Sequence, residues 1–343
     1  MDVRQLEYFL AVVDNGGINR AAEALHVAQP SLSQSIKKLE RELKTSLFHR
    51  VGRGLVIAPA GEALVGPARR VLREMDAAGS AVREVRDLRS GRVDIAALSD
   101  TSTDPVSVWV AKFRLIHPDV QVRVEERDDP AEVLELVRTG AAELGITVLP
   151  AAAGELIQSH LVSQYFALVC PPGTDLGLPD PTPLEQLSEI PLVMGDRQTA
   201  SRHFLERSLR AGGVEPWIAV EVPQRGAVVP MVVAGAGAAI VGHRLAAEAR
   251  NRGAVVTDLS PGIERELGLI HRPGRLSEAA SAFLTCTREA LDQWDSAVSR
   301  RMRSGMSRLD AVAATVARAE EVNAAAFART SPLRRRTGEQ TLD

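Results

Sequence analysis

Residues 18–43 read INRAAEALHVAQPSLSQSIKKLEREL, and this stretch decides the fold of the N-terminal part of the chain. Its apolar residues recur three and four positions apart, first over residues 18–25 and again over residues 32–43. That spacing predicts a short helix and a longer one that begins near residue 29. The same spacing over residues 6–13 predicts a supporting helix upstream. Three helices with a tight turn before the last are typical of a helix-turn-helix, whose second helix enters the DNA major groove.

The outward face of the longer helix carries polar side chains that could contact DNA. The candidates are Gln29, Pro30, Ser31, Ser33, Gln34, Lys37 and Lys38. Glutamine can pair two ways with adenine, and serine can donate or accept a hydrogen bond. Lysine is better suited to phosphate, which fixes the register of a protein on DNA without reading its sequence. We therefore expect the first turns to read bases and the later turns to hold the backbone.

A basic hairpin is predicted directly after this helix. Apolar residues at 47–48 and 55–57 flank the glycine-rich tip Arg50-Val51-Gly52-Arg53-Gly54. Such a wing could place Arg53 in a minor groove and Arg50 against a phosphate. The alternative is a small helical domain whose charges are merely solvated. Residues 1–60 hold eight basic and six acidic residues, so the DNA-binding prediction depends on charge placement and not on bulk charge.

The N-terminal region carries a pattern of many residues over about sixty positions, which is a far more specific signal than a single short motif. It comprises Asp2, Gln5, Leu6, Phe9, Ala21, Ala22, Leu25, Gln29-Pro30-Ser31-Leu32-Ser33, Ile36, Leu39, Glu40, Leu43, Leu47, Phe48, Arg50, Arg53 and Pro59-Ala60-Gly61. In these positions the chain closely resembles the LysR-type transcriptional regulators. The resemblance covers roughly residues 1–295 and implies a sequence-specific, DNA-binding regulator of transcription.

Four positions depart from the family pattern. Gly17, Ala28 and Ala58 stand where the family usually has a capping Ser or Thr, and Lys44 stands where it usually has Gly. Alanine in place of a capping Ser or Thr typically costs ~1 kcal/mol of stability. We expect these changes to soften the domain and alter phosphate contacts without removing DNA binding.

Composition is that of an ordinary water-soluble protein of two or more domains. The 343 residues are 45% hydrophobic and 25% charged, with a net charge of −3. No apolar run approaches the ~20 residues of a membrane span, and the N-terminus lacks the apolar core of a signal peptide, so we expect a cytoplasmic protein without membrane contact. Cys170 and Cys286 are too few for a disulfide framework. The net charge is +2 over residues 1–60, −9 over residues 61–295 and +4 over residues 296–343.

A long helix with a heptad pattern is predicted between residues 59 and 89. Its seam consists of Leu64, Ala68, Val71, Met75, Ala78, Val82 and Val85. This spacing is typical of a two-helix coiled coil, and the resemblance also implies dimerisation through this helix. We therefore predict Leu64, Val71, Met75, Val82 and Val85 as dimerisation residues. The alternative is a single helix packed on its own domain.

Strands and helices alternate through the rest of the chain, which indicates a mainly parallel sheet covered on both faces. The predicted strands are 93–98, 120–124, 144–149, 167–170, 192–194, 218–222, 238–241 and 267–271, and the predicted helices are 106–117, 130–139, 200–211, 227–233 and 277–296. Two similar halves with two crossings resemble the periplasmic-binding-protein fold, which is the effector domain of the family. The crossings near residues 161–164 and 264–269 would form its hinge.

Ligands of open α/β sheets bind outside the carboxyl ends of strands, often at helix N-termini. That rule selects Ser99, Thr101, Ser102, Thr103, Val148, Gly195, Arg197, Gln198, Thr199, Gln224 and Arg225. Hydroxyl groups, helix N-termini and two arginines suggest an anionic small molecule as the effector. The alternative is that these are ordinary turn and cap residues.

Sequence patterns of catalysis are missing. The chain has no GxSxG, Walker loop, GxGxxG after a strand or HExxH, and its seven histidines are scattered. We predict no enzyme activity, no metal site and no cofactor beyond the effector. Two other functions stay open: an architectural DNA binder with an unused cleft, and an enzyme built on the α/β body. A thiol switch is also possible in the family, although an inert thiol is the simpler interpretation of each cysteine.

The predicted architecture is an α+β multidomain chain with four parts. They are a winged helix-turn-helix at 1–58 (its motif at about 18–37), a linker helix at 59–89, a two-lobed effector domain at 92–295 and an extension at 296–343. Lobe one would comprise 92–161 and about 268–295, and lobe two 162–267. The extension has helical spacing up to residue 327 and then a polar, disordered end. The expected partners are double-stranded DNA, a second copy in a dimer that pairs into tetramers, the effector, and RNA polymerase if the protein activates transcription.

Overall fold

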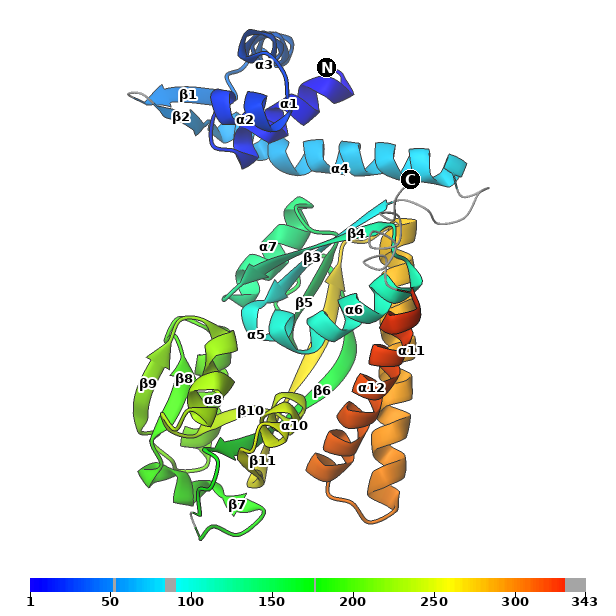
Figure 1. The fold of residues 1–343 in the computed structure, drawn as a ribbon. Helices are drawn as coiled ribbons and strands as arrows, with labels where there is room; N and C mark the ends of the chain where they lie inside the picture. The colour runs from blue at the N-terminus through cyan, green and yellow to red at the C-terminus, as the bar shows by residue number, and fades with distance from the viewer. Residues whose placement is uncertain (52–53, 84–90, 176, 331–343) are drawn as a thin grey trace, which may run out of the picture.

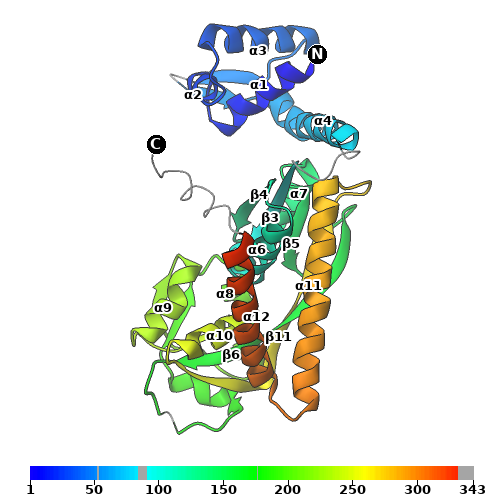
Figure 2. The same ribbon diagram turned by 45° about the vertical axis from the view of Figure 1, so that its right-hand side comes forward.

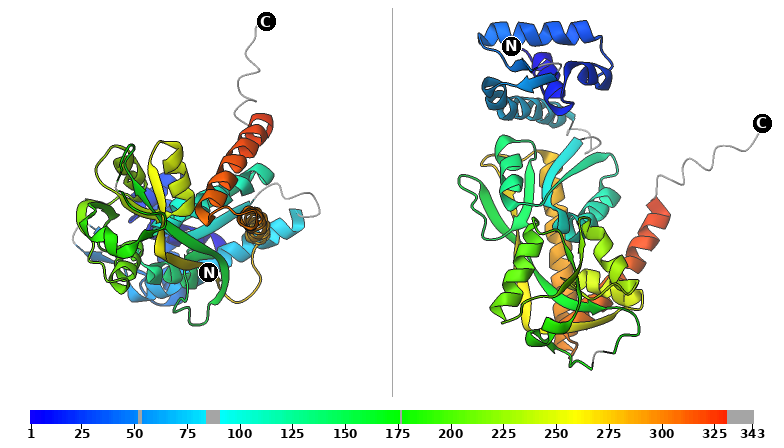
Figure 3. Two further views of the ribbon diagram at one scale, coloured as in Figure 1. Left: turned by 90° about the horizontal axis from the view of Figure 1, so that it is seen from below. Right: turned by 90° about the vertical axis from the view of Figure 1, so that its left-hand side faces the viewer.

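A small N-terminal head is stacked on a larger two-lobed body, and a long helix lies between them (Figure 1). The computed structural model describes residues 1–51, 54–83, 91–175 and 177–330. Lobe one of the body lies next to the head, and lobe two lies at the far end of the molecule (Figures 1 and 3). The winged helix-turn-helix head and the α/β body agree with the predicted fold class.

Three helices form the head: α1 (Val3–Asp14), α2 (Ile18–Ala24) and α3 (Gln29–Leu43). The side chain of Asp2 accepts a hydrogen bond from the backbone N–H of Gln5, and the side-chain oxygen of Gln5 accepts one from the backbone N–H of Asp2, which fixes the start of α1. Phe9 and Leu32 are fully buried in the common core of the three helices. The apolar periodicity therefore produces the predicted three-helix arrangement.

Two apolar residues of the predicted pattern are not core residues. Leu25 is 38% exposed because α2 ends one residue before it, and Leu43 is 36% exposed at the last turn of α3. Two of the unusual cap residues lie at the two ends of α3. Ala28 at the start of α3 offers no side-chain cap, and Lys44 at its end adopts φ +55°, a left-handed conformation that favours glycine.

The wing consists of the antiparallel strands β1 (Phe48–Val51) and β2 (Gly54–Ile57). A side-chain oxygen of Glu40 accepts a hydrogen bond from the N–H of Leu47 at 2.8 Å, which ties the wing to α3. The first turn of the next helix approaches the same place, since a Cβ at Gly61 would lie 2.3 Å from the carbonyl oxygen of Leu47. Glycine is therefore required there by close packing.

The linker helix α4 spans Pro59–Arg83 and continues through Pro67. Its early seam packs within the protomer: Ala68 is buried in the head core, and Leu64 packs against that core. Leu64 is only half-buried there, and its role in dimerisation stays a prediction. Val71 and Met75 remain exposed. The side chain of Val82 and the whole of Val85 lie outside the described residues.

Lobe one is built on three parallel strands, β3 (Gly91–Leu98), β4 (Val120–Arg127) and β5 (Leu144–Val148). Around them lie the short helices α5 (Ser99–Thr101) and η2 (Ser102–Val106) and the longer α6 (Ser107–Ile116), α7 (Pro130–Thr139) and α11 (Glu278–Arg303). One core joins β3 to α6 and α11, and another joins β3 to α7 on the opposite face. Helices thus cover both faces of the sheet, as predicted.

Lobe two contains β7 (Thr182–Pro183), β8 (Leu192–Gly195), β9 (Ile218–Val222) and β10 (Ala239–Gly242). Its helices are η3 (Leu184–Glu189), α8 (Ala200–Ala211), η4 (Arg225–Ala227), α9 (Val228–Val233) and α10 (His243–Asn251). Strands β8 and β9 are parallel. The sequence did not predict α10, whose buried face consists mainly of alanines.

Two long antiparallel strands, β6 (Ile157–Cys170) and β11 (Val255–His271), run through both lobes. The main sheet has the order β10-β6-β11-β5-β3-β4. The short strands predicted at 167–170 and 267–271 are therefore wrong in length, because polar residues interrupt the apolar pattern of β6 and β11 where they cross between the lobes. The two predicted crossings lie side by side there, with Gln164 opposite Arg265.

The C-terminal region forms a helical pair. Helix α11 continues to Arg303, beyond the predicted end at 296, and α12 (Arg308–Thr330) returns alongside it (Figure 2). Residues 331–343, including Arg334–Arg336, lie outside the described residues, so the predicted disorder of that end is not addressed.

Candidate nucleic-acid interface and ligand pocket

The outward face of α3 presents polar side chains to solvent. Gln29, Pro30, Ser31, Gln34, Lys37 and Lys38 are exposed, and Ser33 is half-buried. Within the described part of the chain, no hydrogen bond or ion pair occupies the side chains of Gln29, Gln34 or Lys37. Their orientation is fixed from below, because Leu32, Ile36 and Leu39 of the same helix are buried in the head core. We name the seven outward side chains, from Gln29 to Lys38, the α3 reading face.

The wing carries the two arginines that were predicted to contact DNA. Arg50 lies in β1, with its backbone opposite Leu55. Arg53 lies outside the described residues, as does the side chain of Arg50. Their predicted contacts with DNA therefore stay predictions.

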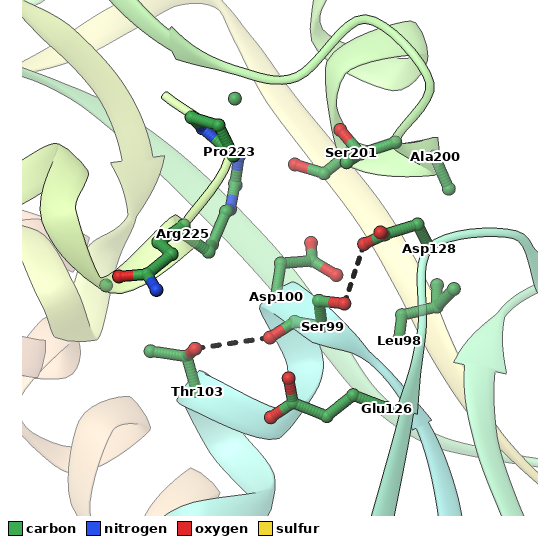
Figure 4. A pocket seen from close by; sticks show the side chains of 14 residues that line it. Leu98, Ser99, Asp100, Thr103, Glu126, Asp128, Ala200, Ser201, Pro223 and Arg225 are labelled. Atoms are coloured by element: carbon green, nitrogen blue, oxygen red, sulfur yellow. Dashed lines mark hydrogen bonds between the residues drawn. The ribbon is translucent and has the colours of Figure 1, made fainter. Parts of the chain in front are cut away.

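A pocket of about 460 Å³ opens between the two lobes (Figure 4). Six of the predicted effector residues line it: Ser99, Thr103, Gly195, Thr199, Gln224 and Arg225. Its walls come from the ends of β3 and β4 in lobe one, and from the end of β8, the start of α8 and the loop after β9 in lobe two. The rule that ligands bind at the carboxyl ends of strands thus locates the pocket.

Five predicted effector residues do not line this pocket. Thr101 is buried and donates its hydroxyl to the carbonyl of Leu98, and Ser102 donates to Glu126. Val148 packs into the lobe-one core beside α7. Arg197 turns outward, 80% exposed, and pairs with Glu221. Gln198 is exposed in the turn before α8, where its N–H bonds to Asp196.

The sequence analysis missed the acidic side chains of the pocket. Asp100, Glu126 and Asp128 line it, together with Leu98, Ala200, Ser201, Pro223 and Gly226. Glu126 and Asp128 end or follow β4, so the strand-end rule would have selected them had it been applied to that strand. Asp100 directly follows Ser99 and was not among the predicted residues. The acidic wall changes the chemistry expected of the ligand.

Asp100 forms a buried ion pair with Arg265 of β11. Burial alone would raise the pKa of Asp100, but the positive charges of Arg265 and Arg225 hold it below its ordinary value. Arg265 also donates from Nε to the side-chain oxygen of Gln164 at 2.8 Å. The floor of the pocket is thereby tied to both long strands at the crossing between the lobes.

A second buried ion pair crosses between the lobes. Asp104 of lobe one pairs with Arg244 of α10 in lobe two, and Arg244 also binds Glu248 at 2.6 Å. Burial raises the pKa of Asp104 despite the charge of Arg244. Gln164 donates to the backbone carbonyl of Asp104 at 3.3 Å, so the two ion pairs belong to one network.

Lobe two presents its polar groups at the start of α8. The side-chain oxygen of Thr199 caps this helix, and Arg202 donates to the carbonyl of Gly195 at 2.7 Å, which holds α8 against the end of β8. The N–H of Ala200 donates to the carbonyl of Asp128 at 2.9 Å, a direct backbone bond between the lobes at the pocket. Arg225 makes no hydrogen bond or ion pair with any described residue.

Both cysteines are buried and unpaired. Burial raises the pKa of the Cys170 thiol to about 11 and also raises that of Cys286. Because the thiolate is the reactive form, we expect neither thiol of the folded protein to react with Ellman's reagent at neutral pH, whereas both should react after denaturation. Stoichiometric labelling of the folded protein within minutes would contradict this.

The described residues contain neither a candidate membrane-spanning helix nor a candidate metal site. None of the helices drawn in Figure 1 is both long and apolar enough to cross a membrane. No three His, Cys, Asp or Glu side chains in the described ranges converge as a possible metal site.

A helix-turn-helix head joined by a long helix to a two-lobed body with a pocket between the lobes is the architecture of a DNA-binding protein with a second, ligand-binding domain. The family model described as "LysR substrate binding domain" matches residues 86–292, and that described as "Bacterial regulatory helix-turn-helix protein, lysR family" matches residues 3–62. The chain belongs to the LysR family of DNA-binding transcriptional regulators.

Its relatives include the uncharacterized HTH-type transcriptional regulator YfeR of Shigella flexneri, which is 28% identical over 288 residues, covering 84% of this chain and 93% of YfeR. IlvR of Caulobacter vibrioides is 29% identical over 297 residues, covering 84% of this chain and 98% of IlvR. Among solved structures, full-length OxyR from Pseudomonas aeruginosa has a TM-score of 0.66 at 19% identity and covers 85% of this chain and 94% of its own. Full-length CbnR complexed with its target DNA has a TM-score of 0.58 at 20% identity and covers 84% and 99%.

Proposed function

We propose that this regulator reads a specific operator with the α3 reading face, under the control of a small molecule bound between the lobes. The observation that carries the proposal is the unpartnered polar face of α3, held rigid by its buried opposite side. Gln29, Ser33 and Gln34 supply the donors and acceptors that base edges require, and Lys37 and Lys38 meet phosphate. A regulator of chromosomal transcription works in the cytoplasm, where its DNA is.

Dimerisation is part of the proposal. Val71 and Met75 expose apolar surface on α4, and they repeat at the spacing of a coiled-coil seam with Val82 and Val85. Pairing α4 with its copy would cover this surface and would carry two heads. Two heads can span half-sites about 34 Å apart, one turn of DNA. Dimers would pair into tetramers, with RNA polymerase as a further partner where transcription is activated.

The effector is proposed to present an anionic group to Arg225. This guanidinium lines the pocket with no hydrogen bond or ion pair to a described residue, and it lies close to the capped N-terminus of α8, which also favours negative charge. The pocket joins both lobes, so a ligand that binds one lobe arrangement better than another shifts their angle by its difference in affinity. That angle would set the spacing of the heads and the bend of the bound DNA.

Substitution of Gln29 by alanine tests base reading. We expect Gln29→Ala to lose about 1–3 kcal/mol of discrimination at one base position of each half-site, because a bidentate contact is removed. The matched control is Lys37→Gln on the same helix, which should weaken all duplexes alike and reduce the salt dependence of binding by about one unit of slope. Titration of single-base operator variants at several salt concentrations measures both effects. An unchanged base preference in Gln29→Ala would remove Gln29 from the reading face.

A further inference from the structure

The two walls of the pocket carry opposite charge. Lobe two contributes the guanidinium of Arg225, which makes no hydrogen bond or ion pair with a described residue and is attracted only at longer range by Asp100. Lobe one contributes Glu126 and Asp128, whose carboxylates accept from the hydroxyls of Ser102 and Ser99 at 2.7 and 2.6 Å. Over the described ranges, neither carboxylate has a basic side chain within ion-pair distance. Their negative charge is therefore available to a ligand.

Asp100 adds little further charge because Arg265 neutralises it. Figure 4 shows the arrangement: Arg225 lies across the pocket from Asp128, with Asp100 and Ser99 between them, Glu126 below, and Ser201 on the same side as Asp128. A ligand that bears only negative charge would face Arg225 but would also approach two uncompensated carboxylates. The acidic wall thus opposes a simple anion.

A polar side chain of the pocket wall lacks a hydrogen-bond partner among the described residues. The hydroxyl oxygen of Ser201 is buried, with the residue only 3% exposed, and it has no hydrogen-bond partner in the described structure. Ser201 lines the pocket in the first turn of α8. Buried hydroxyls are nearly always satisfied, so a polar ligand group that reached this wall would supply the partner that Ser201 lacks.

We infer that the effector is amphoteric: a small amino acid whose carboxylate binds Arg225 and Ser201 and whose ammonium group binds Glu126 and Asp128. This inference rests on the proposed function, because it uses the same pocket, and it narrows the anionic ligand to one that also carries a positive charge. Each charged wall then meets its complement, and the ligand links lobe one to lobe two through its own length.

Shape-matched triples test the class of ligand. Each triple consists of an amino acid, the carboxylic acid that lacks its amino group, and the amine that lacks its carboxyl group. The panel takes the protein L-amino acids and short ω-amino acids, and calorimetry with the full-length protein gives each dissociation constant. We expect at least one amino acid to bind about tenfold or more tightly than both of its analogues. In the double variant Glu126→Gln, Asp128→Asn, this preference over the carboxylic acid should disappear, whereas Glu132→Gln, an exposed control on α7, should keep it.

The outcomes separate this inference from the proposed function. A carboxylic acid that binds as tightly as its amino acid, with binding lost in Arg225→Gln, keeps the pocket as the effector site and overturns the amphoteric class. Failure of every amino acid to bind also overturns the amphoteric class. In that case, binding of other organic acids that is lost in Arg225→Gln keeps the pocket as the effector site, and absence of such binding overturns the pocket as well. Binding of an amino acid that Arg225→Gln leaves unchanged contradicts both.

A second observation, independent of the pocket, concerns α12. This helix lies beyond residue 292, where the match to the LysR substrate binding domain ends. Leu309 is buried in the core of lobe two, and Val312 and Val316 pack with Ala247 of α10 and Val298 of α11. The guanidinium of Arg308 lies 3.9 Å from the ring centre of Tyr165.

Helix α12 thereby connects the lobes by a second route. The first half of α11 belongs to the core of lobe one, through Phe283 and Leu291, and its second half packs against α12. Helix α12 in turn binds α10 of lobe two, where Arg250 pairs with Asp310 at 2.8 Å. A change of the angle between the lobes would therefore bend α11 or slide α12 over α10 or α11. We propose that α12 is a brace that restricts movement of the lobes.

Distances between spin labels test the brace. Labels at Glu132→Cys in lobe one and Arg207→Cys in lobe two use exposed sites, while the native thiols are buried. We expect removal of residues 308–343 to broaden the distance distribution in the otherwise full-length dimer, and removal of residues 331–343 alone to leave it unchanged. The paired substitution Arg308→Gln, Asp310→Asn keeps helix α12 but removes two of its polar contacts, and it should give a distance distribution of intermediate width. This variant tests the brace even if the truncated chain does not fold. If either the 308–343 truncation or the paired substitution folds and gives a distance distribution as narrow as that of the intact protein, the proposal that α12 is a brace is overturned.

Discussion

Replacing Arg265 by methionine is expected to lower the free energy of unfolding of the body by about 3–5 kcal/mol, because it leaves the carboxylate of Asp100 buried without its cation. Methionine keeps much of the volume of the side chain, so packing is largely retained. The double variant with Asp100→Asn removes the orphaned charge and should recover a large part of the loss. Urea unfolding of the four members of this cycle measures the effect.

The pH dependence of the cycle gives a further check. The pKa of Asp100 in the folded protein lies below its ordinary value, so the pair stabilises above pH about 4 and the contribution is lost as the pH falls. The deficit of Arg265→Met should therefore shrink as the pH is lowered, because a protonated Asp100 needs no cation. Arg197→Met is the exposed control and should change stability by less than about 1 kcal/mol. Additive losses in the double variant would show that the two side chains do not act as a pair.

Leu32→Ala is expected to be the most damaging single truncation on α3. Leu32 is fully buried in the head core, and a Leu-to-Ala change at such a site costs about 2–5 kcal/mol. The cost is large for a head of this size, whose total stability is of order 5 kcal/mol. We expect the first thermal transition to fall or vanish and specific DNA binding to be lost with it, although no group that touches DNA has changed.

Leu43→Ala is the matched control for this variant, because it makes the same chemical change at the exposed end of the same helix. We expect it to alter stability by less than about 1 kcal/mol and to leave DNA affinity unchanged. Equal effects of the two substitutions would mean that Leu32 does not anchor the reading face.

Local periodicity was sufficient to predict the head. In α3 the apolar residues at positions 32, 36 and 39 are all buried, as the spacing required, and the helix begins at Gln29, where the sequence placed it. The start of the linker helix at Pro59 was predicted, whereas its predicted end at residue 89 lies outside the described residues. A heptad seam also cannot tell which partner covers it. Leu64 faces the head of its own chain, whereas Val71 and Met75 face solvent.

The body was harder to predict because its decisive contacts join distant segments. Strands β6 and β11 pair with each other over most of their length, and no local pattern encodes that pairing. At the pocket, the strand-end rule finds the loops but not the direction of each side chain. Arg197 and Arg225 follow neighbouring strands and look equivalent in sequence, yet Arg197 turns out to Glu221 and Arg225 lines the pocket. The ion pair of Asp100 with Arg265 spans most of the effector domain and could not be seen locally.

The central claim is that the rigid outer side of α3 distinguishes one DNA sequence from another. Selection of bound duplexes from a random pool by the purified dimer tests it most directly, with and without a metabolite extract that supplies the effector. The account predicts enrichment of two related half-sites whose centres lie about one helical turn apart. In Gln29→Ala, the base preference at one position of each half-site should be reduced. A pool that shows no preference for any duplex under either condition would contradict it.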